Sequence, residues 1–136
     1  SDGELNEGTT WESALLASQL SLNNLVVLVD KNGWQAMGRT SEIIPSVFPA
    51  WPTHDALPGW TIRGGNGHDH ELMADFIFTE QIRLKEVGCV PQPIVFMLDT
   101  IKGKGVSFFE DHLLYHYKHV EKDEYERALA ELERIS

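Results

Sequence analysis

The chain has 136 residues, enough for one compact domain with a single hydrophobic core. Its formal net charge is −10 at pH 7 with no offsetting basic stripe, which argues against binding nucleic acid or an anionic membrane. The single cysteine, Cys89, excludes an internal disulfide, and no apolar run approaches the ~20 residues of a membrane-spanning helix. We therefore expect a cytoplasmic protein whose partners are neither nucleic acid nor membrane.

The first predicted elements are a helix and a buried strand. Thr9 or Thr10 is a suitable N-cap, and apolar residues recur near helical spacing through 11–22. Residues 25–30, LVVLVD, form a continuous apolar run, which is typical of a strand buried on both faces. The strand ends at a turn in which the pair Asn32-Gly33 favours positive φ.

The middle of the chain predicts a long loop, because residues 38–59 contain four of the six prolines and show no clear period. We allow one helical turn near 53–57 within it. A short strand at 59–65 and an amphipathic helix at 69–88, with Gly88 as C-cap, follow. A buried strand at 92–100 comes next, then a glycine- and lysine-rich loop and a closing helix whose Tyr125, Leu129 and Leu132 face the core.

Buried strands that alternate with helices indicate an α/β fold, with a parallel sheet and flanking helices. In such sheets, ligands bind beyond the carboxyl ends of the strands. Three segments are expected at that edge. They are SDGELNEG, if a strand precedes it, then DKNGWQ and DTIKGKG.

Asp2 and Asn32 are 30 positions apart, with one helix and one strand between them. This spacing returns the chain to the same edge of the sheet, where a carboxylate and an amide oxygen suit Mg²⁺ that bridges a diphosphate. Gly3 and Glu4 begin the next turn, where free N–H groups can meet phosphate oxygens. Each residue alone is also compatible with an ordinary turn, and the pair is what favours a site.

The segment SDGELNEGTTWESALLASQLSLNNLVVLVDKNGWQAMG resembles the thiamine-diphosphate fingerprint of transketolases, GDGELNEG…WEA…LDNL…VDxNG. It is most similar to the split form, in which the amino-terminal region is a separate subunit. The likeness continues through GGNGHDHE and DTIKGKGVSF to a histidine nine positions after Ser107, and it spans nearly the whole chain. The resemblance implies the thiamine-diphosphate-binding fold, in its diphosphate-binding domain.

The resemblance also implies a cofactor site for thiamine diphosphate and Mg²⁺. Asp2, the Asn32 side chain and the carbonyl oxygen of Trp34 would ligate the metal. Gly3, with Glu4 after it, would offer backbone N–H groups to the diphosphate. The implied activity is the transfer of a two-carbon ketol unit between sugar-type substrates.

Other residues match the family by position. His116 corresponds to a catalytic histidine that reaches the diphosphate and faces the substrate channel, although a lone histidine in such a loop is more often a surface group. Glu7 and Glu12 match glutamates at a subunit interface that links paired active sites. His68 and Asp69 match a motif with a structural role.

The sequence departs from the family pattern at several positions. Ser1 stands where glycine is common, Ala36 replaces a larger apolar residue expected against the cofactor's thiazolium, and Met37 replaces an aspartate. Tyr117 replaces the glycine of WHG and lacks its backbone freedom. These changes keep two alternatives open. One is a thiamine enzyme with a keto-acid donor, and the other is a non-catalytic protein of the assembly.

The resemblance further implies that residues 1–136 are the carboxyl portion of one diphosphate-binding domain. The preceding strands of that domain and the pyrimidine-binding domain would lie outside this chain. We therefore expect a polypeptide that supplies the amino-terminal strands, a separate pyrimidine-binding polypeptide, and a dimer of such units. Catalysis would need this complex.

Overall fold

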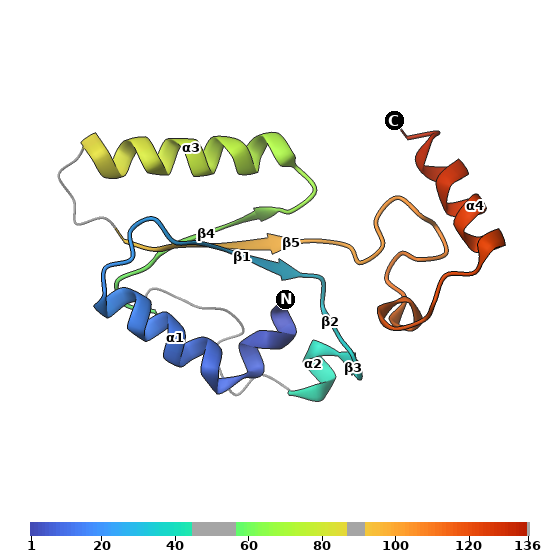
Figure 1. Cartoon of the computed structure of the whole chain (residues 1–136), viewed down its shortest axis with the longest axis horizontal. Coiled ribbons are helices and arrows are strands. Elements are labelled where there is room, and N and C mark those ends of the chain that lie inside the picture. The colour runs from blue at the N-terminus through green and yellow to red at the C-terminus, as the bar shows by residue number, and fades with distance from the viewer. Residues whose placement is uncertain (45–56, 87–91, 136) are drawn as a thin grey trace.

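The computed structural model describes residues 1–44, 57–86 and 92–135, and for Asp2 and residues 80–86 it describes the backbone only. Short 3-10 helices and hairpin strands lie between the main elements (Figure 1). The described elements are, in chain order, η1 (Asp2–Asn6), α1 (Gly8–Gln19), β1 (Val26–Lys31), β2 (Trp34–Gln35), β3 (Gly38–Arg39), α2 (Thr40–Ile43), β4 (Thr61–Asn66), α3 (His70–Glu86), β5 (Ile94–Asp99), η2 (Leu113–His116) and α4 (Lys122–Leu132).

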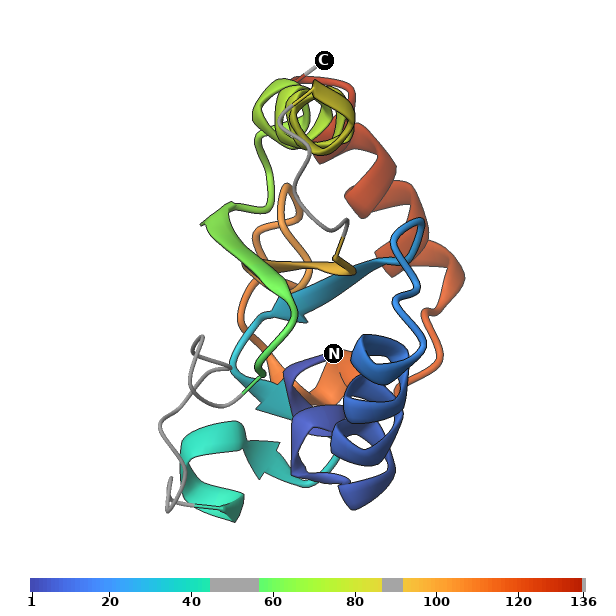
Figure 2. The same cartoon turned by 90° about the vertical axis from the view of Figure 1, so that its left-hand side faces the viewer.

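The main sheet has the strand order β1-β5-β4, and both pairings are parallel. Ile94 at the start of β5 pairs with Val26 on one side and Thr61 on the other. Helix α3 covers one face of this sheet, whereas η1 and α1 cover the other (Figures 1 and 2). The predicted α/β fold with a parallel sheet and flanking helices is confirmed.

The continuous apolar run of β5 divides into two cores because side chains alternate across a strand. Ile94, Phe96 and Leu98 are buried in the cluster beneath α3, where Phe96 stacks on Phe76 with 6.2 Å between ring centroids. Val95 and Met97 are buried in the cluster beneath α1. The central strand therefore holds both layers of the domain together.

Hydrogen bonds from two tryptophans fix α1 over its core. The indole N–H of Trp60, which is 3% exposed, donates to the Ala14 carbonyl at 2.9 Å. The indole N–H of Trp11 donates to the Leu5 carbonyl at 2.7 Å and thereby ties α1 to η1. These bonds leave two large apolar rings in the core with their polar atoms satisfied.

The ends of the first helix and the burial of the first strand differ from prediction. Helix α1 begins at Gly8 with Glu7 as N-cap. The predicted N-caps Thr9 and Thr10 lie inside the first turn, where the Thr10 hydroxyl donates to the Glu4 carbonyl. Strand β1 is an outer strand of the described sheet, and Leu28 is 55% exposed, so the expectation of burial on both faces is wrong. Gly33 has the expected positive φ of 76°.

The predicted loop at 38–59 begins with regular structure. Gly38 and Arg39 form β3, which pairs antiparallel with β2, and α2 follows directly. The remaining strands and helices lie within a few residues of their predicted bounds. The helical turn near 53–57, the C-cap Gly88 and the free Cys89 fall wholly or mainly outside the described residues.

The closing helix exposes the face that was expected to pack. Tyr125, Leu129 and Leu132 are exposed, and Ala128 is the buried residue of α4. Within the described part of the chain, α4 meets a loop rather than the sheet, because the Glu131 carboxylate accepts hydrogen bonds from the N–H and hydroxyl of Ser107.

No helix in the described ranges is long and apolar enough to cross a membrane.

We predict that Gly67→Ala destabilises the protein, because a Cβ there would lie 2.5 Å from Thr100 Cγ2 and 2.9 Å from Leu98 Cβ. Overpacking of this kind costs about 1–3 kcal/mol. The matched control is Gly8→Ala, where a Cβ meets nothing within 4 Å. Urea unfolding should show a lower midpoint for the first variant only, and equal midpoints would contradict the close approach at Gly67.

Candidate functional site

The carboxyl ends of the three parallel strands meet at one edge of the sheet, as Figure 1 shows for the arrowheads of β1, β5 and β4. The pairing register ends with Lys31 opposite Asp99 and Asn66 opposite Asp99. Lys31 Nζ and Asp99 Oδ1 form an ion pair at 2.7 Å across this edge. The turns after β1, β4 and β5 therefore start from neighbouring positions. The sequence predicted this for the turns after β1 and β5, and the turn after β4 is an addition.

Asp30 organises the turn after β1. Its two carboxylate oxygens accept hydrogen bonds from the Thr100 hydroxyl and, at 3.1 Å, from the Asn32 amide nitrogen. The Asn32 amide oxygen accepts the N–H of Trp34 at 2.9 Å. The amide is thus held on both sides. An amide oxygen has two acceptor positions, so one remains beyond the bond from Trp34.

His68 joins the turns after β4 and β5. Its Nε2 accepts the backbone N–H of Ile101 at 2.8 Å, and the backbone N–H of His68 donates to Asn66 Oδ1 at 3.0 Å. Asp69 Oδ1 accepts the N–H of Leu72 at 2.9 Å in the first turn of α3. In the described structure both residues thus make hydrogen bonds that hold these turns.

Helix η1 lies against β1 and β2, which places the SDGE turn beside the Asn32–Trp34 turn. A Cβ at Gly3 would be 3.0 Å from Gln35 Cγ, so this close approach favours glycine. The N–H of Glu4 donates to the Ser1 carbonyl at 3.2 Å, so the expectation of a free N–H is wrong for Glu4. The buried Gln35 Nε2 lacks a hydrogen-bond partner among the described residues.

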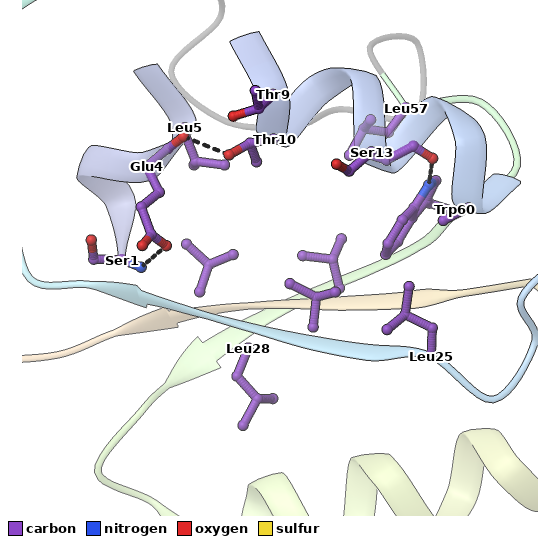
Figure 3. Close-up of a pocket in the computed structure, with 15 residues that line it drawn as sticks. Ser1, Glu4, Leu5, Thr9, Thr10, Ser13, Leu25, Leu28, Leu57 and Trp60 are labelled. Atoms are coloured by element: carbon purple, nitrogen blue, oxygen red, sulfur yellow. Dashed lines mark hydrogen bonds and ion pairs between the residues drawn. The ribbon is translucent and has the colours of Figure 1, made fainter. Parts of the chain in front are cut away.

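A pocket of about 370 Å³ lies between η1 and α1 on one side and β1 on the other (Figure 3). Core residues such as Trp60, Val29 and Val95 line it, with polar groups from Ser1 and Glu4. Residues of the Asn32–Trp34 turn do not line this pocket. Because core residues line it, the pocket continues the hydrophobic core beneath α1, next to the outer strand β1.

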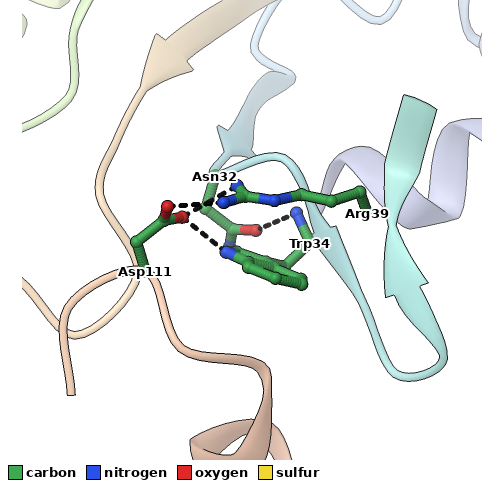
Figure 4. Close-up of polar contacts among 4 residues, drawn as sticks. All are labelled: Asn32, Trp34, Arg39 and Asp111. Atoms are coloured by element: carbon green, nitrogen blue, oxygen red, sulfur yellow. Dashed lines mark hydrogen bonds and ion pairs between the residues drawn. The ribbon is translucent and has the colours of Figure 1, made fainter. Parts of the chain in front are cut away.

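Arg39, Asp111 and Trp34 form a polar cluster beside the Asn32–Trp34 turn (Figure 4). Asp111 accepts two bonds from the Arg39 guanidinium, at 2.8 and 2.5 Å, and one from the Trp34 indole N–H at 2.6 Å. The guanidinium carbon lies 3.8 Å from the Trp34 ring centroid. Arg39 and then Trp34 lower the pKa of Asp111, and Asp111 raises the pKa of Arg39.

His116 ends η2, which lies against β2. Its side chain is exposed and has no hydrogen bond to the described residues. The adjoining segment is fixed by Glu124 of α4, whose Oε1 accepts bonds from Lys118 Nζ at 2.5 Å and the Tyr115 hydroxyl at 3.1 Å. The Lys118 ammonium lowers the pKa of Glu124 most, followed by the Glu121 N–H, and Glu124 raises the pKa of Lys118.

The structure brings most of the predicted site elements together around β2. Strand β2 contains Trp34. Helix η1 lies against this strand and contains Asp2, Gly3 and Glu4. Helix η2, which contains His116, also lies against it. Ala36 follows β2 in the hairpin turn and is exposed. The side chains of Glu7 and Glu12 are exposed on the η1–α1 segment and make no hydrogen bond or ion pair to this group in the described ranges.

The sequence did not single out Arg39, Asp111, Asp30 or Thr100. Arg39 and Asp111 are 72 positions apart, and no periodic pattern relates them. Asp30 was placed at a strand end, which could have marked it as a residue of this edge. Its partnership with Thr100 depends on the β1–β5 pairing, which the order of elements alone does not specify.

Comparison with known families gives one match over nearly the whole chain. Residues 1–132 match the family described as "Transketolase, thiamine diphosphate binding domain". Among solved structures, a transketolase from Campylobacter jejuni superposes with a TM-score of 0.75 at 19% identity, over 96% of this chain and 19% of that one. This superposition supports the fold.

Curated relatives include subunits of transketolases. An apulose-4-phosphate transketolase subunit from Actinobacillus succinogenes is 36% identical over 96% of this chain and 44% of its own length. The 6-deoxy-6-sulfo-D-fructose transketolase subunit SqwG of a Clostridium species is 34% identical over 98% of this chain and 46% of its own length. The chain thus spans less than half the length of these relatives.

We predict that Glu124→Gln lowers the free energy of unfolding at pH 7 and lowers it less at pH 3. The pKa of Glu124 is lowered on folding, so its stabilisation is present above the pKa of an unfolded glutamate, about 4.3, and is lost as pH falls through the folded pKa. Urea unfolding at both pH values measures this difference.

The control for this prediction is Glu126→Gln, which removes a more exposed carboxylate on the same helix, 3.8 Å from Lys122. Its effect on the unfolding midpoint should be small at both pH values, because exposed pairs contribute little. A Glu124→Gln effect that is equal at pH 7 and pH 3 would contradict the role of the ionised carboxylate.

Proposed function

The chain belongs to the transketolase family of thiamine-diphosphate-binding domains, and from this premise we propose that it anchors Mg²⁺ and the diphosphate of thiamine diphosphate. The enzyme that contains it would transfer a two-carbon ketol unit between sugar-type substrates. The observation that carries the proposal is the convergence of η1, the Asn32–Trp34 turn and η2 on β2. These are the elements that contain the residues matched to the cofactor site.

The residues present fit a magnesium ion. Carboxylate, amide and carbonyl oxygens are the ligands that Mg²⁺ prefers, and Asp2, Asn32 and the Trp34 carbonyl would provide one of each. Asn32 is oriented by Asp30 and keeps one acceptor position on its amide oxygen.

The residues also fit the diphosphate. Gly3 has no Cβ to hold η1 away from Gln35, and its N–H makes no hydrogen bond to the described residues. A free N–H at the start of a helical turn is a suitable donor to phosphate oxygens. Glu4 lies in the same turn of the cofactor site, but its own N–H is bonded to the Ser1 carbonyl and would not donate to the diphosphate.

Thiamine diphosphate, when bound, would supply the carbanion chemistry that protein side chains lack. The residues of this chain would hold the cofactor in position and donate or accept protons. His116 is exposed on η2 beside β2, where its neutral imidazole can donate one hydrogen bond and accept another. We assign it to the substrate side of the cofactor, and Ala36 to the surface that faces the thiazolium.

We infer that the chain works with partner polypeptides in the cytoplasm, as part of one diphosphate-binding domain. Two relatives are described as transketolase subunits. In the described sheet, β1 pairs on one side only, Leu28 is exposed, and the pocket behind η1 is apolar. These features fit further strands of the same domain beside β1. A pyrimidine-binding polypeptide would complete the site, and Glu7 and Glu12 would face the interface of a dimer.

We predict that Asn32→Ala in the assembled complex weakens Mg²⁺-dependent thiamine diphosphate binding by more than about 100-fold, beyond the effect of typical outer-shell changes. Asp2→Ala should do the same, because each variant removes one metal ligand. Calorimetric titration with and without Mg²⁺ measures this. The control is Asn24→Ala, an exposed asparagine before β1. If the wild-type complex binds no cofactor, the proposed function is wrong.

We predict that His116→Ala lowers kcat by about 10²- to 10⁴-fold, the usual contribution of a positioned acid–base group, while cofactor binding changes little. Turnover with a ketose-phosphate donor and an aldose acceptor measures the effect. His119→Ala, three positions away and also exposed, is the matched control. Turnover with a keto acid and none with a ketose phosphate would favour the keto-acid alternative.

A further inference from the structure

We propose that Asp111 is a positioning residue that locks the Asn32–Trp34 turn to the segment containing His116, so that the metal ligands and the histidine keep a fixed relative position. The inference rests on the proposed function and deepens it. It concerns a residue that touches neither the metal nor the diphosphate. Figure 4 shows the cluster that carries it.

The Asp111 carboxylate accepts three hydrogen bonds from two residues of the β2–β3 hairpin. Oδ1 accepts from Arg39 Nη1 at 2.8 Å and from Trp34 Nε1 at 2.6 Å, and Oδ2 accepts from Arg39 Nη2 at 2.5 Å. A bidentate arginine–carboxylate pair fixes orientation as well as distance, because two parallel bonds allow one mutual geometry. The third bond adds the indole to this rigid unit.

The backbone of Asp111 is held in an unusual conformation. Its φ is +54°, a region that non-glycine residues seldom occupy. Its N–H donates to the Lys102 carbonyl at 2.9 Å, which closes the glycine- and lysine-rich loop. A residue in such a conformation persists where its surroundings determine it. Here the bonds made by the N–H and the carboxylate of Asp111 hold the residue in place.

Trp34 is held both through its indole side chain and through its backbone N–H. The indole is held by Asp111 and lies against the Arg39 guanidinium, and the backbone N–H donates to Asn32. The carbonyl of Trp34 therefore has little freedom to turn. Since the proposed function assigns that carbonyl to Mg²⁺, Asp111 orients a metal ligand through the side chain of the same residue.

Asp111 lies five positions before His116, in the segment that reaches η2. The His112 side chain accepts the N–H of Leu114 at 3.3 Å, so the chain between Asp111 and η2 is itself ordered by a local bond. Arg39 and Asp111 neutralise each other, so the pair adds no net charge near the metal. Its contribution is therefore geometric.

The test uses Asp111→Asn in the assembled complex. We expect Mg²⁺ affinity at saturating thiamine diphosphate to fall about 10- to 100-fold, as for other residues that orient metal ligands. Without cofactor, hydrogen exchange should rise at 32–36 and at 112–117 together. Asp123→Asn, which removes an exposed carboxylate from α4, should change neither readout. Mg²⁺ affinity equal to that of Asp123→Asn would overturn the proposal.

A second variant separates positioning from folding. Trp34→Phe keeps an aromatic ring beneath Arg39 but removes the indole N–H bond and one of the two fused rings. It leaves the Arg39–Asp111 pair in place, so it should weaken Mg²⁺ binding in the same direction and by less. If Asp111→Asn does not assemble, Trp34→Phe decides, and unchanged Mg²⁺ affinity would overturn the proposal. A wild-type complex that binds no cofactor refutes the proposed function instead, whereas wild-type binding with unaffected variants refutes only the role of Asp111.

Discussion

The pairing of β5 with two parallel neighbours is the constraint on which the rest of the structure depends. Its register sets Asp99 opposite both Lys31 and Asn66, so three turns leave the sheet from adjacent positions. Because of that register, the Thr100 hydroxyl reaches Asp30 and the N–H of Ile101 reaches His68. A slip of one residue would exchange the two faces of β5 and separate these pairs.

The sequence predicted the sheet well because burial on both faces leaves a plain signal. The run from Ile94 to Leu98 has no polar residue, and α1 and α3 bury alternate members of it. The same signal misled at β1, where Leu28 is as apolar as its neighbours but is exposed in this chain. Apolar residue type thus predicts burial without showing which surface would cover the side chain. The exposed apolar residues of α4 misled in the same way.

The candidate site was predictable only where its residues lie near one another in the sequence or at a strand end. Asn32-Gly33 was recognised by its turn chemistry, and Gly33 does have positive φ. Arg39 and Asp111 belong to two loops, and their meeting depends on how a hairpin and a glycine-rich loop fold over the same strand end. Glu4 shows the opposite case, since an N–H that the motif offers to a phosphate is bonded to the Ser1 carbonyl.

The residues that depart from the family pattern are exposed in the described structure. Met37 is 87% exposed and Tyr117 is 67% exposed, and Ala36 is exposed in the turn between β2 and β3. By contrast, Gly3, Asn32 and Trp34 each meet a specific neighbour within the site. Substitutions at the first group leave the Asn32–Trp34 turn intact, so they alter what faces the hairpin and η2 from outside. Under the proposed function Ala36 faces the thiazolium and Tyr117 lies near the substrate entrance, so the changes bear more on substrate choice than on the metal or the diphosphate.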